Sequence, residues 1–255
     1  MYFKREISVL IPAHNEEKTI ANVIINLSNT FSIFVSEGKL AKFEIIVLDD
    51  GSTDLTYNIA KNIEKDITSI RLIKNAEPTG ILCAFHKLYL EASLDWSLLI
   101  PADDQWPIED IGKFVLNFLE RDQLVPSLYV RKNKREIYSI KRNIVSKFYS
   151  TIASLMCLNY DIDAGSIKIV PTTISNITFR LGIYEEIERL ILAQWITRAR
   201  IQKTYYSWEL RKYGEESGLS MSLIKSATRN FPRLFWEYIL LRKKNQKRVR
   251  KTLGE

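Results

Sequence analysis

The sequence contains only two cysteines, Cys83 and Cys157, so it offers no disulfide framework and suits a reducing cytoplasm. It has no apolar run near the ~18 residues that cross a bilayer, and its first residues show no signal-peptide pattern. Its only histidines, His14 and His86, lack a Cys or His partner at metal spacing, which argues against a zinc site. Glycine-rich dinucleotide loops, Walker loops and nucleophile elbows are also missing.

The chain has 255 residues, of which 46% are hydrophobic, and this predicts one large domain or a domain with a C-terminal appendage. The net charge is +7 and is concentrated near the C-terminus. The basic residues there are Arg242, Lys243, Lys244, Lys247, Arg248, Arg250 and Lys251. Such a run is typical of a tail that binds nucleic acid or anionic lipid, and a solvated, frayed terminus explains it equally well.

Strands and helices alternate in the first hundred residues. Continuous apolar runs predict strands over residues 7–11, 43–48, 69–74 and 96–100, and apolar residues at helical spacing fill the segments between them. Ser52 or Thr53 is placed to cap the helix that follows the second strand. Strands that are apolar on both faces favour a parallel sheet covered by helices.

Beyond residue 120 the pattern is looser. We expect strands in LVPSLYVRK, SIKIV (166–170) and KTYYSWEL (203–210), and a helix over about Asn143–Cys157. The last third is predicted to be helical, with Pro232 marking a start or a kink. The residues expected on its apolar face are Phe231, Leu234, Phe235, Tyr238 and Leu241.

The first four strands end in polar loops, PAHNE, DDGS, NAEPTG and PADDQ, which would share one rim of a parallel sheet. Asp49 and Asp50 could accept hydrogen bonds from a nucleobase and a ribose, or they could simply cap the next helix. Asp103 and Asp104, with the Gln105 oxygen, could hold Mg²⁺ or Mn²⁺ on a diphosphate, or they could face water.

A basic segment, RKNKREIYSIKR, follows the strand expected near residue 128. Arginines such as Arg131, Arg135 and Arg142 suit bidentate contacts with phosphate, and a solvated loop is the alternative.

The ordered set ISVLIPAHNEEKTI, FEIIVLDDGSTD and LLIPADDQWPIEDI resembles family 2 glycosyltransferases. The resemblance is closest to the branch of dolichol-phosphate mannose synthase and bacterial polyprenyl-phosphate glycosyltransferases. DIDAGSIKIV, ERLILA and ELRKYGEESG resemble later blocks of that branch, so about residues 5–220 are covered. The resemblance implies a GT-A fold: an α/β, Rossmann-like, mostly parallel central sheet flanked by helices. It gives a glycosyltransferase domain over residues 1–220 and an amphipathic, basic, helical C-terminal extension over 221–255.

The matching positions imply specific roles. The expected nucleotide-sugar contacts are Pro12, His14, Glu16, Leu48, Asp50, Pro101, Ala102, Asp103 and Gln105. Asp103 and Gln105 match the family's metal-holding aspartate and glutamine. Arg131, Arg142 and Ser146 match residues at the acceptor phosphate, so the expected catalytic set is Asp103, Arg131 and Arg142.

Five departures from the family pattern stand out. His14 replaces a tyrosine, Pro101 stands where the first aspartate of Asp-Ala-Asp would be, and Asp104 is an added acid. The late block is one residue longer than usual, running from Arg211 to Ser217, and the long C-terminal transmembrane helices of many relatives are absent.

The resemblance implies an inverting transferase that moves a sugar from a UDP- or GDP-linked donor to a polyprenyl phosphate, with Mg²⁺ or Mn²⁺. Little general-base help is needed because that acceptor is already anionic, although Asp161 and Asp163 are candidates. The alternatives are a transferase that extends a glycan or glycolipid head group, and a non-catalytic nucleotide-sugar-binding protein.

The basic C-terminus is expected to hold the enzyme on the anionic cytoplasmic face of a membrane as a peripheral protein, and no nucleic-acid partner is expected. Core packing or a homo-oligomer contact is the other explanation for its apolar face.

Overall fold

The computed structural model describes residues 3–132, 140–163, 166–175, 177, 186–206, 232–233, 235–252 and 254, without the side chains of residues 131, 140–142 and 145. The strands are β1 (Glu6–Ala13), β2 (Lys42–Asp50), β3 (Ile70–Asn75), β4 (Trp96–Leu99), β5 (Ser127–Arg131), β6 (Lys168–Pro171) and β7 (Gln202–Tyr206). The helices are α1 (Ile20–Ser36), α2 (Thr56–Asp66), α3 (Ile81–Glu91), α4 (Ile108–Leu119), α6 (Ile140–Cys157), α8 (Glu186–Thr197) and α10 (Arg242–Thr252), and a short π-helix, η1 (Trp236–Leu240), precedes α10.

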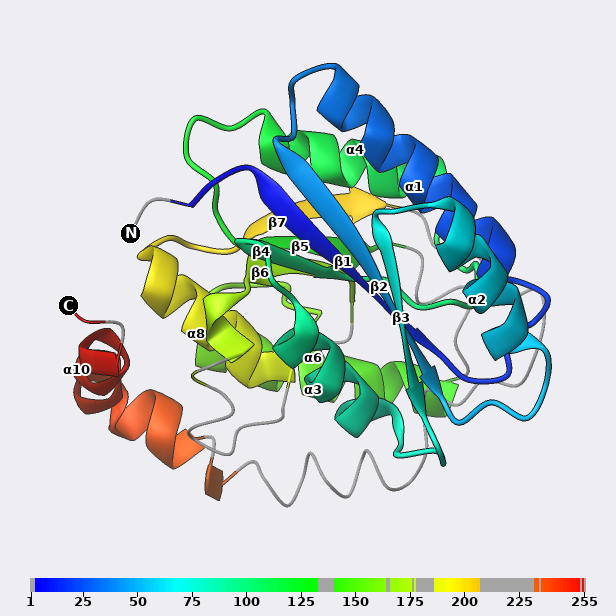
Figure 1. Ribbon diagram of the computed structural model, residues 1–255. Coiled ribbons are helices and arrows are strands. Elements are labelled where there is room, and N and C mark those ends of the chain that lie inside the picture. Colours follow the sequence, from blue (N-terminus) through cyan, green and yellow to red (C-terminus); the bar gives the residue numbers. More distant parts are fainter. Residues whose placement is uncertain are drawn as a thin grey trace.

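The strands form one sheet in the order β3-β2-β1-β4-β6-β5-β7 (Figure 1). All neighbouring strands are parallel except β6, which runs antiparallel to both β4 and β5. The mostly parallel sheet expected from the sequence is therefore confirmed, with one reversed strand that the apolar run at 166–170 did not reveal.

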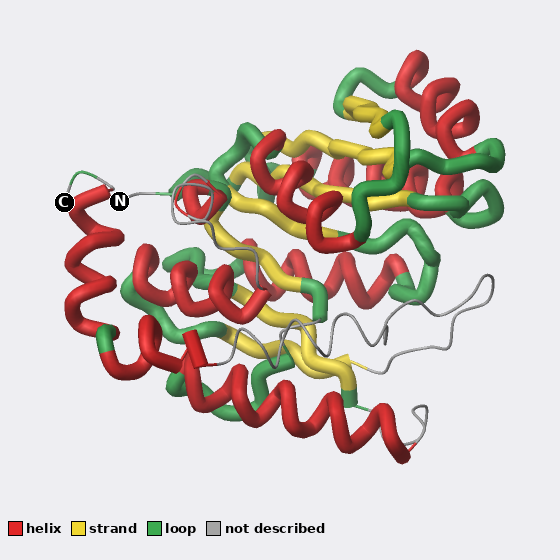
Figure 2. The backbone as a smooth tube through the Cα atoms, turned by 90° about the horizontal axis from the view of Figure 1, so that it is seen from below, coloured by secondary structure: helices red, strands yellow, loops and turns green. Residues whose placement is uncertain are grey.

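Helices cover both faces of the sheet, as the view from below shows (Figure 2). Alternate residues of β1 and β2 enter two separate cores, because successive strand side chains point to opposite faces. Ile7, Val9 and Ile11 pack with α1, α2 and α4, whereas Leu10 packs with α3, α6 and α8. The predicted β-α alternation follows directly from this two-sided burial.

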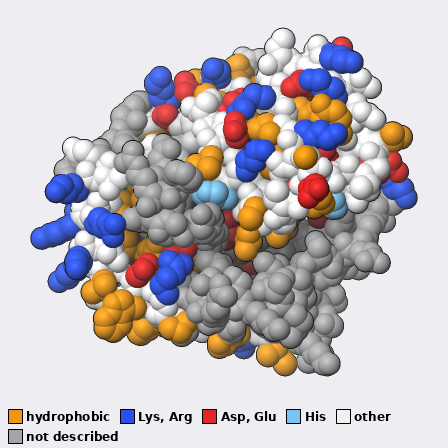
Figure 3. Space-filling model, turned by 60° about the horizontal axis from the view of Figure 1, so that its bottom comes forward, with side chains coloured by type: hydrophobic (Ala, Val, Ile, Leu, Met, Phe, Trp, Pro, Cys, Tyr) orange, Lys and Arg blue, Asp and Glu red, His pale blue; other side chains and the backbone are white. Residues whose placement is uncertain are grey.

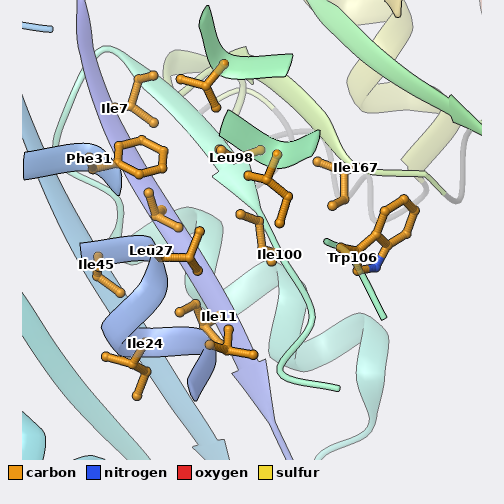
Figure 4. Packing of buried hydrophobic residues seen from close by; sticks show 14 of the residues in the cluster. Ile7, Ile11, Ile24, Leu27, Phe31, Ile45, Leu98, Ile100, Trp106 and Ile167 are labelled. Carbon is orange, nitrogen blue, oxygen red and sulfur yellow. The ribbon is translucent and has the colours of Figure 1, made fainter. Parts of the chain in front are cut away.

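The first core lies between α1 and the sheet, and its side chains are almost wholly buried. Figure 4 shows the helix side chains directed at those of the strands: Ile24, Leu27 and Phe31 against Ile7, Ile11, Ile45 and Leu98. Full burial of one such side chain contributes about 1.5–3 kcal/mol. This packing fixes β1 and β2, and with them the loops at their carboxyl ends.

The C-terminal segment packs against the second core. Tyr238 and Val249 are buried in it, and the Tyr238 ring lies 5.4 Å from that of Trp195 in α8. Arg233 pairs with the buried Glu188 of α8 at 3.2 Å. Of the predicted apolar face, Phe231 and Leu234 lie outside the described residues, as does the proposed boundary at residue 220. Among the described residues, no helix is both long enough and apolar enough to span a bilayer.

Candidate functional site

The carboxyl ends of the first strands meet at one rim, as the sequence predicted. Ala13 lies opposite Asp49 in the β1–β2 pairing, and Asp50 lies opposite Asn75 in the β2–β3 pairing. Leu99 at the end of β4 lies beside Leu10 of β1, so the loop that carries Asp103 follows at the same edge.

Two of the rim loops are tied together by hydrogen bonds. Asn15, whose φ is +55°, donates its backbone N–H to the Ser52 hydroxyl at 3.0 Å and accepts the N–H of Thr53 at 2.9 Å. The prediction that Ser52 or Thr53 caps the following helix is wrong. Because both residues bind Asn15, the first N–H of α2, that of Thr56, bonds instead to the Asp54 carboxylate at 2.9 Å.

His14 points toward the end of β2. Its Nδ1 lies 2.8 Å from the backbone oxygen of Asp50, and its Nε2 lies 3.3 Å from the amide nitrogen of Asn15. The first contact needs a proton on Nδ1 and the second needs a bare Nε2, so both fit one neutral tautomer. His14 therefore joins the two loops, and its predicted contact with a nucleotide stays a prediction.

The Asp50 carboxylate is occupied by the loop between β3 and α3. One oxygen accepts hydrogen bonds from Asn75 at 2.6 Å and from the N–H and hydroxyl of Thr79 at 3.0 and 2.8 Å. The other accepts the N–H of Gly80 at 3.1 Å. Burial alone would raise the pKa of this carboxyl, but these hydrogen bonds outweigh it and hold the pKa below its ordinary value. Asp50 thus organises the rim, a role that the sequence did not reveal.

Gly51 lets that loop approach closely. Its φ is +68°, and a Cβ there would lie 2.6 Å from backbone atoms of Glu77 and Pro78. Asp49, the neighbour of Asp50, faces the other side of the sheet, is fully buried, and makes no hydrogen bond to a described residue through its carboxylate oxygens. An unpaired buried carboxylate is unfavourable for stability. The predicted pair of acids therefore splits into two unlike groups.

The second pair of acids, Asp103 and Asp104, is also divided. Asp104 has φ +53° and accepts a hydrogen bond from Asn22 of α1 at 3.0 Å, so it belongs to the packing between the loop and the helix. Asp103 is half-buried, and its carboxylate accepts the N–H of Gln105 at 3.3 Å. Pro101 is half-buried just after β4, and Ala102 is buried. The structure thus gives the two adjacent acids different contacts.

The donor set at Asp103 suits a metal that also binds phosphate. Among the described residues, no three His, Cys, Asp or Glu side chains gather to hold a metal by themselves. Mg²⁺ and Mn²⁺ on nucleotide phosphates need only one or two protein oxygens, since phosphate oxygens and water complete the shell. Asp103 and the side-chain oxygen of Gln105, two residues apart on a rim loop, fit that partial set.

The predicted acceptor residues are only partly described. Arg131, at the end of β5, lies opposite Tyr206 in the β5–β7 strand pairing, and Ser146 is half-buried on α6. The side chains of Arg131 and Arg142 lie outside the described residues. So do Arg135, the glycine of the Asp-x-x-x-Gly block at position 165, and the late block from Arg211 to Ser217.

The two candidate bases lie before β6. The buried Asp163 accepts a hydrogen bond from the Ser166 hydroxyl at 2.9 Å. Burial and a hydrogen bond with Asp161 raise the pKa of Tyr205 to about 12.

Sequence reasoning missed a buried charge cluster on the α3–α8 side of the sheet. Lys168 of β6 lies 2.6 Å from Glu186, which also pairs with Arg189 at 3.1 Å. Burial opposes ionisation of Glu186, but the two cations outweigh it and hold its pKa below the ordinary value. The Arg189 guanidinium stacks 4.0 Å above the Tyr89 ring. A lysine inside the apolar run SIKIV was the available signal, because buried lysines are almost always paired.

Comparison with known proteins agrees with this geometry. Residues 8–175 match the family model for glycosyl transferase family 2. The chain is 29% identical over 143 residues to a dolichol-phosphate mannosyltransferase of Pyrococcus furiosus, in a match that covers 56% of this chain and 38% of that protein. It is 31% identical over 125 residues to a UDP-N-acetylglucosamine–dolichyl-phosphate N-acetylglucosaminyltransferase of Methanococcus voltae, covering 43% and 45% of the two chains. The chain thus matches less than half the length of these relatives.

A solved structure shares the fold. Glucosyl-3-phosphoglycerate synthase of Mycobacterium tuberculosis, in complex with Mn²⁺, UDP-glucose and phosphoglyceric acid, superposes with a TM-score of 0.59 at 18% identity. The superposition covers 92% of this chain and 79% of that one. The motifs, the mostly parallel sheet and the family match agree, and the chain belongs to glycosyl transferase family 2.

Proposed function

We propose that this protein is an inverting glycosyltransferase that moves a sugar from a nucleotide diphosphate donor to a polyprenyl phosphate. The observation that carries the proposal is the position of Asp103 and Gln105, on the loop after β4, at the rim that the β1 and β2 loops share. The named functions of the curated relatives support the acceptor class, since two of them act on dolichyl phosphate.

The roles of the rim residues follow from their placement. A divalent cation, when bound, would stabilise the negative charge that grows on the leaving diphosphate. Asp103 and Gln105 would hold that cation, while the linked β1 and β2 loops bind the nucleoside. Pro12 and Glu16 remain the proposed contacts there, whereas Leu48, whose side chain is fully buried in the second core, is left only its backbone for such a contact. An anionic acceptor phosphate attacks without losing a proton, which fits a rim whose acids are mostly held in hydrogen bonds.

The acceptor phosphate would lie near the end of β5, where Arg131 ends the strand. Arg142 and Ser146, near the start of α6, remain its proposed partners. Arginine suits this task because its planar guanidinium binds two phosphate oxygens at once.

The adjacent acids provide a matched pair of variants. Asp103→Asn should remove metal-dependent sugar transfer from a nucleotide sugar to polyprenyl phosphate, whereas Asp104→Asn should keep it because Asp104 bonds to Asn22. Nucleotide diphosphate with Mn²⁺ should raise the melting temperature of wild type and of Asp104→Asn, but not that of Asp103→Asn, which lacks the proposed metal ligand. Ligand at 100 times its Kd stabilises the folded protein by about 2.7 kcal/mol. Testing UDP and GDP in parallel identifies the base.

Each outcome decides between the alternatives. Full activity of Asp103→Asn would contradict the metal assignment. Activity with soluble saccharides or glycolipid head groups and none with polyprenyl phosphate would favour the head-group-extending transferase. Donor binding without turnover on any of these acceptors would favour a non-catalytic nucleotide-sugar-binding protein.

A further inference from the structure

Helix α6 carries apolar side chains on two opposite faces. One face is buried in the second core through Ala153, Met156 and its last residue, Cys157. On the other, Ile144 and Phe148 are 65% and 61% exposed. Leu155 is 53% exposed, and at ~100° per residue these three side chains lie within about 40° of one another around the helix. A surface helix normally presents polar residues there, so this stripe marks a contact surface.

The C-terminal segment lies next to the end of α6 and carries exposed apolar side chains of its own. The Arg242 guanidinium lies 3.4 Å from the backbone oxygen of Met156, which places the start of α10 at the end of α6. In η1, directly before α10, Trp236 and Leu240 are 58% and 56% exposed, although Tyr238 between them is buried. Figure 3 shows hydrophobic side chains gathered at the lower left, beside Lys and Arg side chains. We call the exposed side chains Ile144, Phe148, Leu155, Trp236 and Leu240, together with the basic side chains of α10, the docking face.

The charge of the docking face is positive, and Glu237, the one acid of η1, pairs with Arg233 at 3.5 Å. Seven of the eleven residues of α10 are Lys or Arg, and neither α10 nor α6 contains an acidic residue. Symmetric pairing of two copies through this face would bring the same basic helices together, because an isologous interface repeats one patch on both sides. That arrangement is repulsive, whereas an anionic surface with an apolar interior complements both features.

We propose that the docking face binds the surface of an anionic lipid bilayer, with its apolar side chains in the headgroup–acyl boundary and the α10 cations on lipid phosphates. The binding surface is thus larger than the basic terminus alone and includes a helix of the glycosyltransferase domain. In Figures 1 and 2, α6 begins on the side of the molecule where β1–β3 end. A chain docked through α6 would hold the rim close to the headgroups, where a lipid phosphate lies. This last step alone rests on the proposed function.

Vesicle flotation of the full chain tests the proposal. Wild type should float with phosphatidylcholine vesicles that contain phosphatidylglycerol, and binding should weaken at least about tenfold in Ile144→Gln/Phe148→Gln/Leu155→Gln. The matched control is Ile25→Gln/Ile33→Gln/Val35→Gln, which alters three exposed residues of α1 and should bind as wild type does. Lys243→Gln/Lys244→Gln/Lys247→Gln should weaken binding and reduce its dependence on salt. Circular dichroism confirms that each variant folds.

Three results would overturn the proposal: no flotation of wild type, equal flotation of the α6 variant, or equal weakening by the α1 control. A wild-type dimer that the α6 variant converts to a monomer, without any change in flotation, would show that a second copy covers this face. The vesicles contain neither sugar donor nor acceptor. Failure of vesicle binding and failure of sugar transfer are therefore observed independently.

Discussion

Asp50→Asn tests whether the Asp50 carboxylate holds the loop between β3 and α3 in place. An asparagine keeps one acceptor oxygen for Asn75 and Thr79, but its amide group then faces the N–H of Gly80. One charge-assisted hydrogen bond is replaced by a contact between two donors. Hydrogen bonds to charged groups contribute about 1.5–3 kcal/mol, so we expect the free energy of unfolding to fall by about 2–3 kcal/mol.

Thermal denaturation measures this loss. For a chain of this size, the expected drop in melting temperature is about 4–12 °C at neutral pH. The pKa of Asp50 is lowered in the folded state, so its contribution is complete above the unfolded pKa of about 3.9 and is lost as the pH falls through the folded value. The difference in melting temperature between wild type and Asp50→Asn should therefore become smaller as the pH is lowered.

The control for Asp50→Asn is Asp66→Asn, which removes the same charge from an exposed position at the end of α2. It should leave the melting temperature within about 1 °C of wild type. An unchanged melting temperature in Asp50→Asn at neutral pH would refute the structural role of the carboxylate. If the difference in melting temperature between wild type and Asp50→Asn stayed constant down to acidic pH, the ionised carboxylate of Asp50 would not be the cause of the stabilisation.

Two further substitutions test the rim. Gly51→Ala should destabilise the fold more than Gly38→Ala. Both glycines have a positive φ, which costs alanine about 1–2 kcal/mol, but of the two only Gly51 would bring a Cβ within 2.6 Å of backbone atoms. Equal losses of unfolding free energy in chemical denaturation would contradict the close approach of the loop. Pro101→Asp should tighten Mn²⁺ binding severalfold in a calorimetric titration with nucleotide diphosphate, because it supplies the first carboxylate of the Asp-Ala-Asp pattern that the family resemblance implies. Unchanged affinity would contradict the proposed metal position.

The first half of the fold could be predicted because each strand is a continuous apolar run that ends in turn-forming residues. Burial on both faces leaves few arrangements for such strands, and a parallel sheet covered by helices satisfies them. The direction of β6 could not be predicted in this way. SIKIV is apolar in either orientation, and its antiparallel pairing with β4 and β5 depends on the path of the preceding chain.

The site was less predictable than the fold, because its polar groups act across loops that are distant in sequence. Ser52 and Thr53 have the chemistry of helix caps, yet Asn15, which is 37 residues away from Ser52, occupies both. The same holds for Asp50, whose partners are Asn75 at the end of β3 and Thr79 and Gly80 in the loop that follows. Sequence patterns report local propensity and the period of burial, and neither contains the register that brings two turns together.

The loop after β4 departs from the family pattern at Pro101 and Asp104 but keeps Asp103 at the rim. Spacing alone left Asp103 and Asp104 as equal candidates, the family resemblance favoured Asp103, and in the structure only Asp104 of the two has a positive φ. Asp104 adopts the left-handed conformation that aspartate tolerates, and its bond to Asn22 fixes the loop against α1. Pro101 restricts the same loop from the other side, since its ring fixes φ. The chain has one carboxylate fewer here than the Asp-Ala-Asp pattern that the family resemblance implies, but the loop that presents Asp103 is held at both ends before any ligand arrives. A preorganised ligand loses less conformational entropy on binding, so we expect the stiffness of the loop to compensate in part for the missing carboxylate in the proposed metal site.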